Sequence, residues 1–246
     1  MTTIPVIDFQ LHAVGKEGCV ELDNLGSEMC QALEGIGFCY LKNHGISEEI
    51  INEAFRSSKD FFSQPVNEKE KFARSHNYNF GWVGLEVEKL NPERPVGDYK
   101  EAWNITLEDH SLEWPSEKVP NFKPSMQKLY EMCTDLSKRI FDVISVGLKL
   151  DVMNCEDQYV PATPIPGTIV VNIGDLMQRW TADKLKATKH RVLNPSNEQQ
   201  RRQNRQSMAF FVHPDDKLMI ECLDKSNKYE PISSIDYLNS RFKATY

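Results

Sequence analysis

Three residues in the second half of the chain have side chains that could hold a metal ion and a carboxylate. His190 opens an apolar, strand-like run, and Arg205 and Ser207 stand two positions apart at the start of another, QSMAFFV. A neutral imidazole is a common metal ligand, and an arginine fork beside a hydroxyl on one strand face could bind a carboxylate. On spacing alone, an ordinary strand histidine and a basic surface loop are the favoured explanations.

The first 150 residues, which would position such a site from one side, are predicted to be mainly helical. Apolar side chains recur at helical spacing in residues 20–36 and 123–150, and Ser47 is a good N-cap for a further helix. The run FCYLK, residues 38–42, is predicted to be a strand.

After residue 150 the pattern changes to strand-like runs separated by Pro, Gly and Asn: LDVM, QYVPAT, GTIVVNI, HRVLN and QSMAFFV. A last short helix is expected in ISSIDYLNSRF, capped by Ser233 or Ser234. A mainly helical region 1–150 followed by a β-rich region 151–246 predicts an α+β fold, with both regions in one structural unit.

Composition narrows the classes of function. The 246 residues include 29 Lys and Arg against 36 Asp and Glu, and the net charge of −7 argues against nucleic-acid or anionic-membrane partners. No apolar run approaches the roughly 20 residues that span a bilayer, and the N-terminus does not resemble a signal peptide. The six Cys form no CxxC pair. The sequence therefore predicts a cytoplasmic protein with reduced thiols.

Several common catalytic motifs are missing. The chain contains no GxSxG, GxxxxGK[ST] or HExxH motif, and the Gly35-Ile36-Gly37 stretch does not complete GxGxxG. The sequence therefore lacks the motifs typical of hydrolases with a nucleophilic serine, of nucleotide-dependent enzymes and of zinc proteases.

A longer series of motifs resembles the isopenicillin N synthase-like branch of the Fe(II)- and 2-oxoglutarate-dependent oxygenases. The motifs follow the family's order along nearly the whole chain and are IPVIDF, GFCYLKNHGI, FFSQPVNEKEKF, DYKEAWNI, PIPGTIVVNIGDLMQRWTADKLKATKHRV and RQSMAFFVHPDD. The resemblance implies N-terminal helices packed on a double-stranded β-helix, or jelly roll, that holds Fe(II) with two His and one carboxylate and oxidises a small organic substrate.

The resemblance also assigns roles to the three residues named above. By position, His190 looks like the distal iron ligand. Arg205 and Ser207 look like the pair that anchors the carboxylate of 2-oxoglutarate, or of the substrate in members that do not use 2-oxoglutarate. No further catalytic residue is implied.

The sequence departs from the family pattern at the other iron ligands. The family places an H-x-D motif between the long helix and the strand before the PxPG turn, but no histidine lies between His110 and His190. We therefore expect an incomplete jelly roll, impaired or absent oxidation, and self-association through exposed strand edges. The alternatives are a non-catalytic truncated isoform or paralogue that binds a carboxylate or a protein partner, and an unstable product.

Candidate substitutes for the missing ligands are weak. His213-Pro214-Asp215 spells H-x-D but follows the Arg-x-Ser run and contains a turn-forming proline. The nearest carboxylates on the required side are Asp151, Glu156 and Asp157, and His110 has no acidic residue two positions on. None of them restores the family pattern.

Two tryptophans could either line a substrate pocket or pack in the core. Trp82 lies in residues 75–100, a stretch rich in Gly, Pro and Asn that is predicted to be a loop, and Trp103 lies in a strand expected at residues 101–106. Both could line a substrate pocket because they stand in the region that resembles the family's substrate-facing part, but ordinary core packing is favoured.

Overall fold

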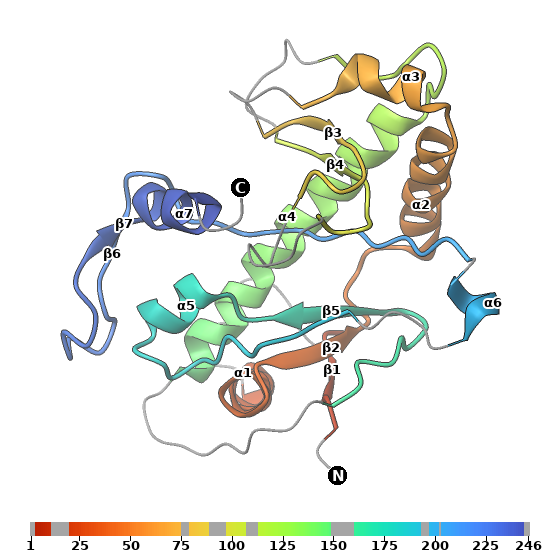
Figure 1. The fold of residues 1–246 in the computed structure, drawn as a ribbon. Helices are drawn as coiled ribbons and strands as arrows, with labels where there is room; N and C mark the ends of the chain where they lie inside the picture. Colours follow the sequence, from red (N-terminus) through yellow and green to blue (C-terminus); the bar gives the residue numbers. More distant parts are fainter. Residues whose placement is uncertain are drawn as a thin grey trace. The chain divides into compact units, whose positions relative to one another are not determined.

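The computed structural model describes most of the chain and divides it into two compact units. The first unit comprises residues 1–48 and 131–234, and the second comprises residues 49–130 and 235–246. Figure 1 shows the elements in chain order. The described residues are 3–10, 20–74, 79–88, 97–106, 113–148, 160–192, 197–201 and 203–243.

A three-stranded sheet in the first unit joins segments that are far apart in the sequence. Its strands are β1 (Val6–Asp8), β2 (Phe38–Lys42) and β5 (Thr168–Asn172), in the order β1-β2-β5. β1 runs parallel to β2, and β5 runs antiparallel to it with Tyr40 opposite Val170. β-Branched and aromatic side chains favour such a pleated, half-buried surface. The fully buried side chains of the sheet are Ile7, Cys39 and Leu41.

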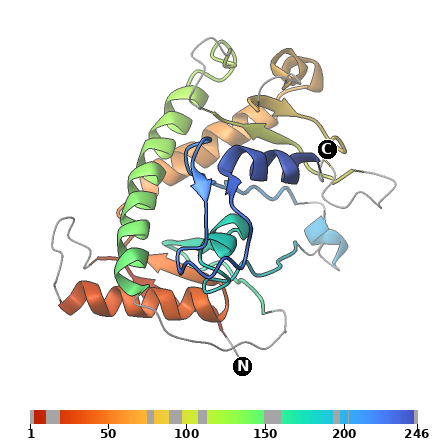
Figure 2. The ribbon, with the colours of Figure 1, turned by 90° about the vertical axis from the view of Figure 1, so that its left-hand side faces the viewer.

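Two helices of the first unit meet at glycines. In α1 (Val20–Gly35), Gly26 faces Gly147 at the end of α4 (Phe122–Gly147), and Figure 2 shows the two helices crossing there. A Cβ atom on Gly147 would lie 2.0 Å from the Gly26 carbonyl oxygen. The backbones can approach this closely because neither residue has a side chain.

The remaining elements are mostly short. The helices are α2 (Glu48–Phe62), α3 (Val66–Lys69), the 3-10 turn η1 (Glu70–Phe72), α5 (Asp175–Trp180), α6 (Glu198–Arg201) and α7 (Ser234–Lys243). The strands form two antiparallel pairs, β3 (Gly81–Val83) with β4 (Ala102–Asn104) and β6 (Met219–Ile220) with β7 (Ile232–Ser233).

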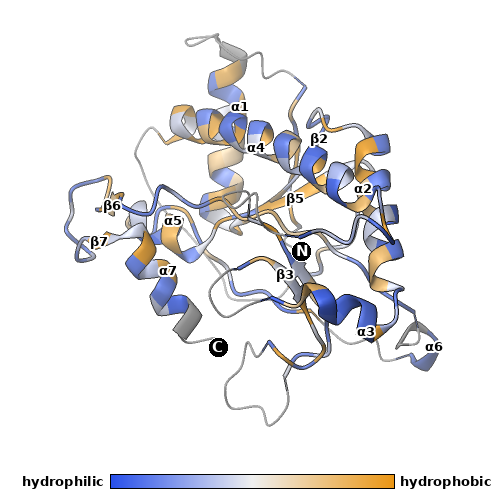
Figure 3. Ribbon diagram, turned by 90° about the horizontal axis from the view of Figure 1, so that it is seen from above, coloured by the Kyte–Doolittle hydropathy of each residue, from blue (hydrophilic) through white to orange (hydrophobic). Residues whose placement is uncertain are grey.

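The second unit has an aromatic core between α2 and the first residues of α4. Polar and apolar residues alternate along α2 with helical spacing (Figure 3). Phe61 stacks on Phe122 with ring centroids 5.0 Å apart and meets the edge of Trp103 at 4.8 Å. Beside these rings, the hydroxyls of Ser57 and Ser125 lie 2.5 Å apart, so the polar atoms at this helix contact satisfy each other.

The α+β prediction is confirmed, but three of the predicted strands are not seen as strands. Residues 190–192 of HRVLN and residues 206–212 of QSMAFFV have no strand structure, and the same holds for residues 160–163 of QYVPAT. A strand is stabilised by hydrogen bonds to a neighbouring strand. Within the described ranges none of these segments is paired with a strand in a sheet, so apolar alternation alone was insufficient. LDVM lies outside the described residues.

No helix within the described ranges is both long and apolar enough to cross a bilayer.

Candidate iron and carboxylate site

The segment that leads to the site is fixed against β2 on both sides of β5. Before the strand, the Tyr40 hydroxyl donates a 2.6 Å hydrogen bond to the Thr163 carbonyl, and Gly167 turns the chain with φ +71°. After the strand, the Ile173 N–H donates to the Gly37 carbonyl at 3.1 Å. The proline- and glycine-rich turn and these hydrogen bonds therefore fix the position of β5 beside β2, and with it the point at which the chain enters α5.

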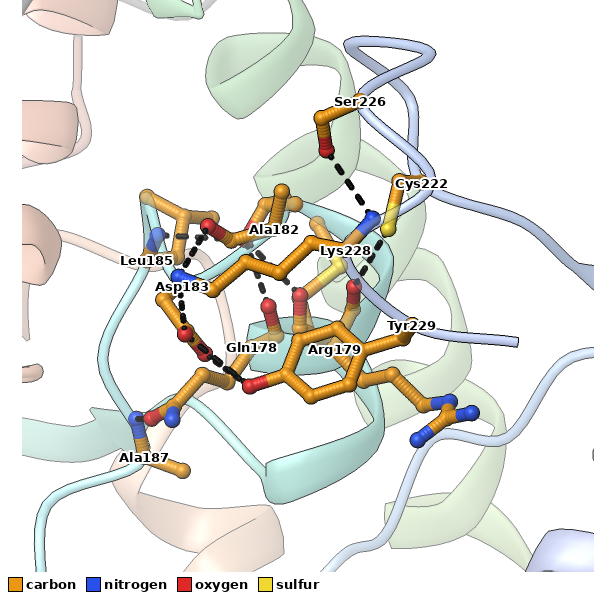
Figure 4. Close-up of polar contacts among 12 residues, drawn as sticks. Gln178, Arg179, Ala182, Asp183, Leu185, Ala187, Cys222, Ser226, Lys228 and Tyr229 are labelled. Atoms are coloured by element: carbon orange, nitrogen blue, oxygen red, sulfur yellow. Dashed lines mark hydrogen bonds and ion pairs between the residues drawn. The ribbon is translucent and has the colours of Figure 1, made fainter. Parts of the chain in front are cut away.

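A compact turn follows α5 and leads into the segment that ends at His190. Figure 4 shows the polar contacts of this turn. Ala182 and Asp183 both adopt left-handed conformations, with φ 51° and 70°. The Thr181 hydroxyl accepts a hydrogen bond from the Leu185 N–H at 3.1 Å, and the Gln178 side-chain oxygen accepts one from the Ala187 N–H at 2.6 Å. These side chains satisfy backbone donors of a turn that has no regular ladder of backbone hydrogen bonds.

Asp183 ties this turn to the segment that follows β6. The Tyr229 hydroxyl donates to its two carboxylate oxygens at 2.8 and 2.9 Å, and the Lys228 ammonium lies 2.6 Å away. Burial acts to raise the pKa of Asp183, but the hydrogen bonds from Lys228, Tyr229 and Gln178 together hold it below its usual value. The Arg179 guanidinium stacks over the Tyr229 ring at 4.8 Å. We call Asp183, Lys228 and Tyr229 the Asp183 clamp.

His190 is exposed at the end of a segment that is anchored to the end of α1 and the turn before β2. The Lys186 N–H donates to the Leu33 carbonyl at 3.1 Å, and the Thr188 hydroxyl donates to the Ile36 carbonyl at 2.7 Å. The His190 Nδ1 atom lies 3.1 Å from the Thr188 carbonyl oxygen. A carbonyl can only accept, so Nδ1–H is the donor in this contact.

Arg205 and Ser207 are exposed on irregular backbone, not on the strand that their pattern predicts. Among the described residues, no hydrogen bond or ion pair links either of them to His190. The structure thus places the three sequence-derived site residues in one unit but does not bring them into contact. Their roles in holding iron and 2-oxoglutarate stay predictions of the resemblance.

The described residues do not supply a three-ligand iron site. Nowhere in these ranges do three His, Cys, Asp or Glu side chains converge. His213 and Asp215 are exposed, and the His213 ring stacks against Phe211 with centroids 6.5 Å apart. Asp151, Glu156, Asp157 and His110 lie outside the described residues. The residues present here do not fit an Fe(II) centre that needs two His and a carboxylate.

Trp82 and Trp103 belong to the packed interior of the second unit. Trp82 is buried, and its indole N–H donates to the Glu101 carboxylate at 2.9 Å. The same carboxylate accepts a 2.7 Å bond from the buried Lys69 ammonium. Trp103 packs among aromatic rings, including Trp114 at 5.5 Å. The ordinary core-packing interpretation thus fits both residues.

The Asp183 clamp is the part of this region that sequence reasoning missed. Nothing in the local pattern around Asp183 indicates a partner, because Lys228 and Tyr229 come from a distant part of the chain. The available signal was limited to the aspartate itself, a residue type that tolerates left-handed turns.

Comparisons with known families and proteins match nearly the whole chain. The family described as "non-haem dioxygenase in morphine synthesis N-terminal" matches residues 4–126, and the "2OG-Fe(II) oxygenase superfamily" matches residues 132–214. A 2-oxoglutarate-Fe(II) type oxidoreductase, ppzD of Metarhizium rileyi, is 25% identical over 305 aligned positions, covering 89% of this chain and 85% of the relative. The 2-oxoglutarate-dependent dioxygenase htyE of Aspergillus rugulosus is 23% identical, covering 89% and 93%.

Solved structures show the same fold. A full-length Neurospora crassa protein, crystallised in complex with alpha-KG and thymine, superposes with a TM-score of 0.80 at 24% identity and covers 99% of this chain and 97% of its own. A 2OG-Fe(II) oxygenase family protein from Caulobacter crescentus also gives 0.80, at 22% identity, covering 99% of both chains. The resemblance seen in the sequence is confirmed: the chain belongs to the 2-oxoglutarate- and Fe(II)-dependent oxygenase superfamily, with Fe(II) and 2-oxoglutarate as the family's cofactors.

Proposed function

We propose that this chain is an oxidoreductase-family member whose own Fe(II)- and 2-oxoglutarate-dependent oxidation is abolished or strongly impaired. One observation carries the proposal: His190 is the only residue that matches a family iron ligand, and the segment between His110 and His190 contains no other histidine. Any residual turnover would act on a small organic molecule, the class that includes the thymine bound in the Neurospora crassa structure.

The chemistry of the ligands explains why one histidine is insufficient. Two imidazoles and a carboxylate on one face fix Fe(II) and leave adjacent positions open for cosubstrate and oxygen. A single exposed imidazole forms one exchangeable bond to the metal. It fixes neither the position of the iron nor the positions left open for cosubstrate and oxygen. The absence of a converging set of three ligand side chains within the described ranges supports the same conclusion.

The length of the alignments supports a missing segment. The ppzD alignment spans 305 positions and that of the dioxygenase frbA spans 330, whereas this chain has 246 residues. These relatives therefore contain residues with no counterpart here. A deletion that removes the first His and the carboxylate would account for both the length and the single ligand.

Oxygen-dependent formation of succinate tests the proposal. The full chain is incubated with excess Fe(II), 2-oxoglutarate, ascorbate and oxygen, and succinate is quantified against an anaerobic sample. We expect no succinate above the level of the His190→Ala variant, because the iron is not held. Succinate that requires oxygen and disappears in His190→Ala would overturn the proposal and identify His190 as a working ligand.

A further inference from the structure

The outer edge of β5 is an unusual surface for a sheet edge. Its five residues, Thr168–Asn172, include neither a charged residue nor a proline, and three of them are Ile or Val. Figure 3 shows it as an apolar strand. Natural edge strands are normally protected by charges, prolines or short length, because unpaired backbone groups accept another strand. Within the described ranges, no strand pairs with β5 on the side away from β2.

The opposite edge of the same sheet has the usual protection. β1 is only three residues long and ends in Asp8, whose carboxylate lies 3.1 Å from the Lys42 ammonium. A strand that paired with this edge would have to accommodate the charged Asp8 side chain. The two edges therefore differ, and only β5 is suited to accept a partner.

The alternating hydrogen-bond pattern along β5 shows which of its backbone groups point away from β2. In an antiparallel pair, residues alternate between those bonded to the partner and those directed away from it. Ile173 donates to Gly37, so the odd-numbered residues of β5 face β2. Tyr40, opposite Val170, instead donates to Pro5 at 2.8 Å. The N–H and C=O groups of Val170 and Asn172 therefore point to the outer edge.

A second copy of β5 fits this edge when the two strands run antiparallel. Centring the pair on Val170 places Val170 opposite its own copy and Thr168 opposite Asn172. The Thr168 N–H already donates to the Ile165 carbonyl at 3.2 Å, so the bonds between the two copies come from the Val170 N–H and the Asn172 N–H, which donate to Val170 and Thr168 of the other copy. No charges are opposed across the pair, although each chain carries a net charge of −7. Ile169 would face Val171 of the other copy, which extends the half-buried side of the sheet.

We propose that this chain forms a symmetric homodimer by antiparallel pairing of β5 with β5 of a second copy. The two-fold axis passes through Val170, whose side chain is 45% exposed, and the contact is isologous. Pairing of one short strand buries little surface, so the dimer is weak, with a Kd on the order of 10–100 µM. Association through β5 requires neither iron nor 2-oxoglutarate.

Sedimentation equilibrium across about 1 to 200 µM protein tests the dimer. The wild type is expected to shift from monomer to dimer mass, and added salt should strengthen the dimer because it screens repulsion between the two acidic chains. A wild type that remains monomeric throughout, or that forms large polydisperse aggregates instead of a dimer, overturns the proposal.

Substitutions at Val170 test the location of the contact. Val170→Lys places two like charges on the two-fold axis and should raise Kd at least about tenfold, since opposed like charges destabilise a strand pair. Val170→Thr keeps a β-branched side chain and should retain the dimer. Val66→Lys, at a valine that is 57% exposed elsewhere, is the matched charge control. Equal dimer Kd values for Val170→Lys and Val66→Lys, in chains whose thermal melts are unchanged, would show that the dimer contact does not lie at the outer edge of β5.

Discussion

His44 shows how one buried side chain can connect two parts of the candidate site. It is 5% exposed, its Nδ1 accepts a hydrogen bond from the Ile46 N–H at 3.2 Å, and its ring also bonds the backbone of Gly167 in the turn before β5. The Arg139 guanidinium donates to the His44 carbonyl at 3.0 Å. The turn after β2 and the turn before β5 thus depend on one neutral imidazole.

Protonation of His44 is expected to destabilise the fold below neutral pH. Burial lowers the pKa of His44 below its usual value, and the nearby Arg139 charge lowers it further. Below about pH 6.5 the unfolded chain binds a proton that the folded chain excludes. The free energy of unfolding should therefore fall as the pH drops from about 7.5 to about 5.

Urea denaturation across that pH range measures this effect. His44→Asn, which can keep the acceptor for Ile46, should lose about 1–2 kcal/mol at neutral pH with the bond to Gly167 and should flatten the pH dependence. His213→Asn removes an exposed histidine and is the control. An unchanged slope in His44→Asn would exclude His44 as its cause.

The sequence assigned roles to single residues only where a family pattern marked them. His190, Arg205 and Ser207 gained their roles from the resemblance, since spacing alone favoured a strand histidine and a surface loop. The Asp183 clamp could not be predicted, because an aspartate, a lysine and a tyrosine carry no local signal until the fold brings them together.

Elements with local signals were predicted well. The helices expected at residues 20–36 and 123–150 correspond to α1 (Val20–Gly35) and α4 (Phe122–Gly147), because apolar periodicity is a property of the segment itself. Strands depend on partners elsewhere in the chain. This is why β3 was missed inside a predicted loop and why residues 206–212 are not a strand.

The α1–α4 crossing gives a prediction at the level of elements. A Cβ atom on Gly147 would lie 2.0 Å from the Gly26 carbonyl oxygen and 2.7 Å from the Cys30 sulfur. Gly147→Ala should therefore destabilise the fold by about 1–3 kcal/mol, although alanine is the better helix former. A lower urea midpoint would show the loss.

A glycine with free space provides the control. A Cβ atom on Gly35 meets nothing within 4 Å, so Gly35→Ala should leave the stability unchanged or raise it by up to about 1 kcal/mol. Equal stabilities of Gly147→Ala and Gly35→Ala would contradict the close approach of the two helices.

At the scale of the whole molecule, membership of the family and the proposed loss of activity rest on different observations. Motifs spread over nearly the whole chain place it in the 2-oxoglutarate- and Fe(II)-dependent oxygenase superfamily, but a triad requires three particular side chains in one place. The sequence predicts the loss of the H-x-D motif, because no histidine lies between His110 and His190. It could not show that residues 190–192 and 206–212 would lack strand structure.

Iron content per chain tests the proposed loss of the triad most directly. The full chain is equilibrated anaerobically with Fe(II) and 2-oxoglutarate, separated by gel filtration, and the folded-protein peak is assayed for iron beside His190→Ala. We expect less than about 0.1 Fe per chain in both proteins, since one imidazole does not retain Fe(II) through the separation. About one Fe per chain in the wild type, lost in His190→Ala, would contradict the account.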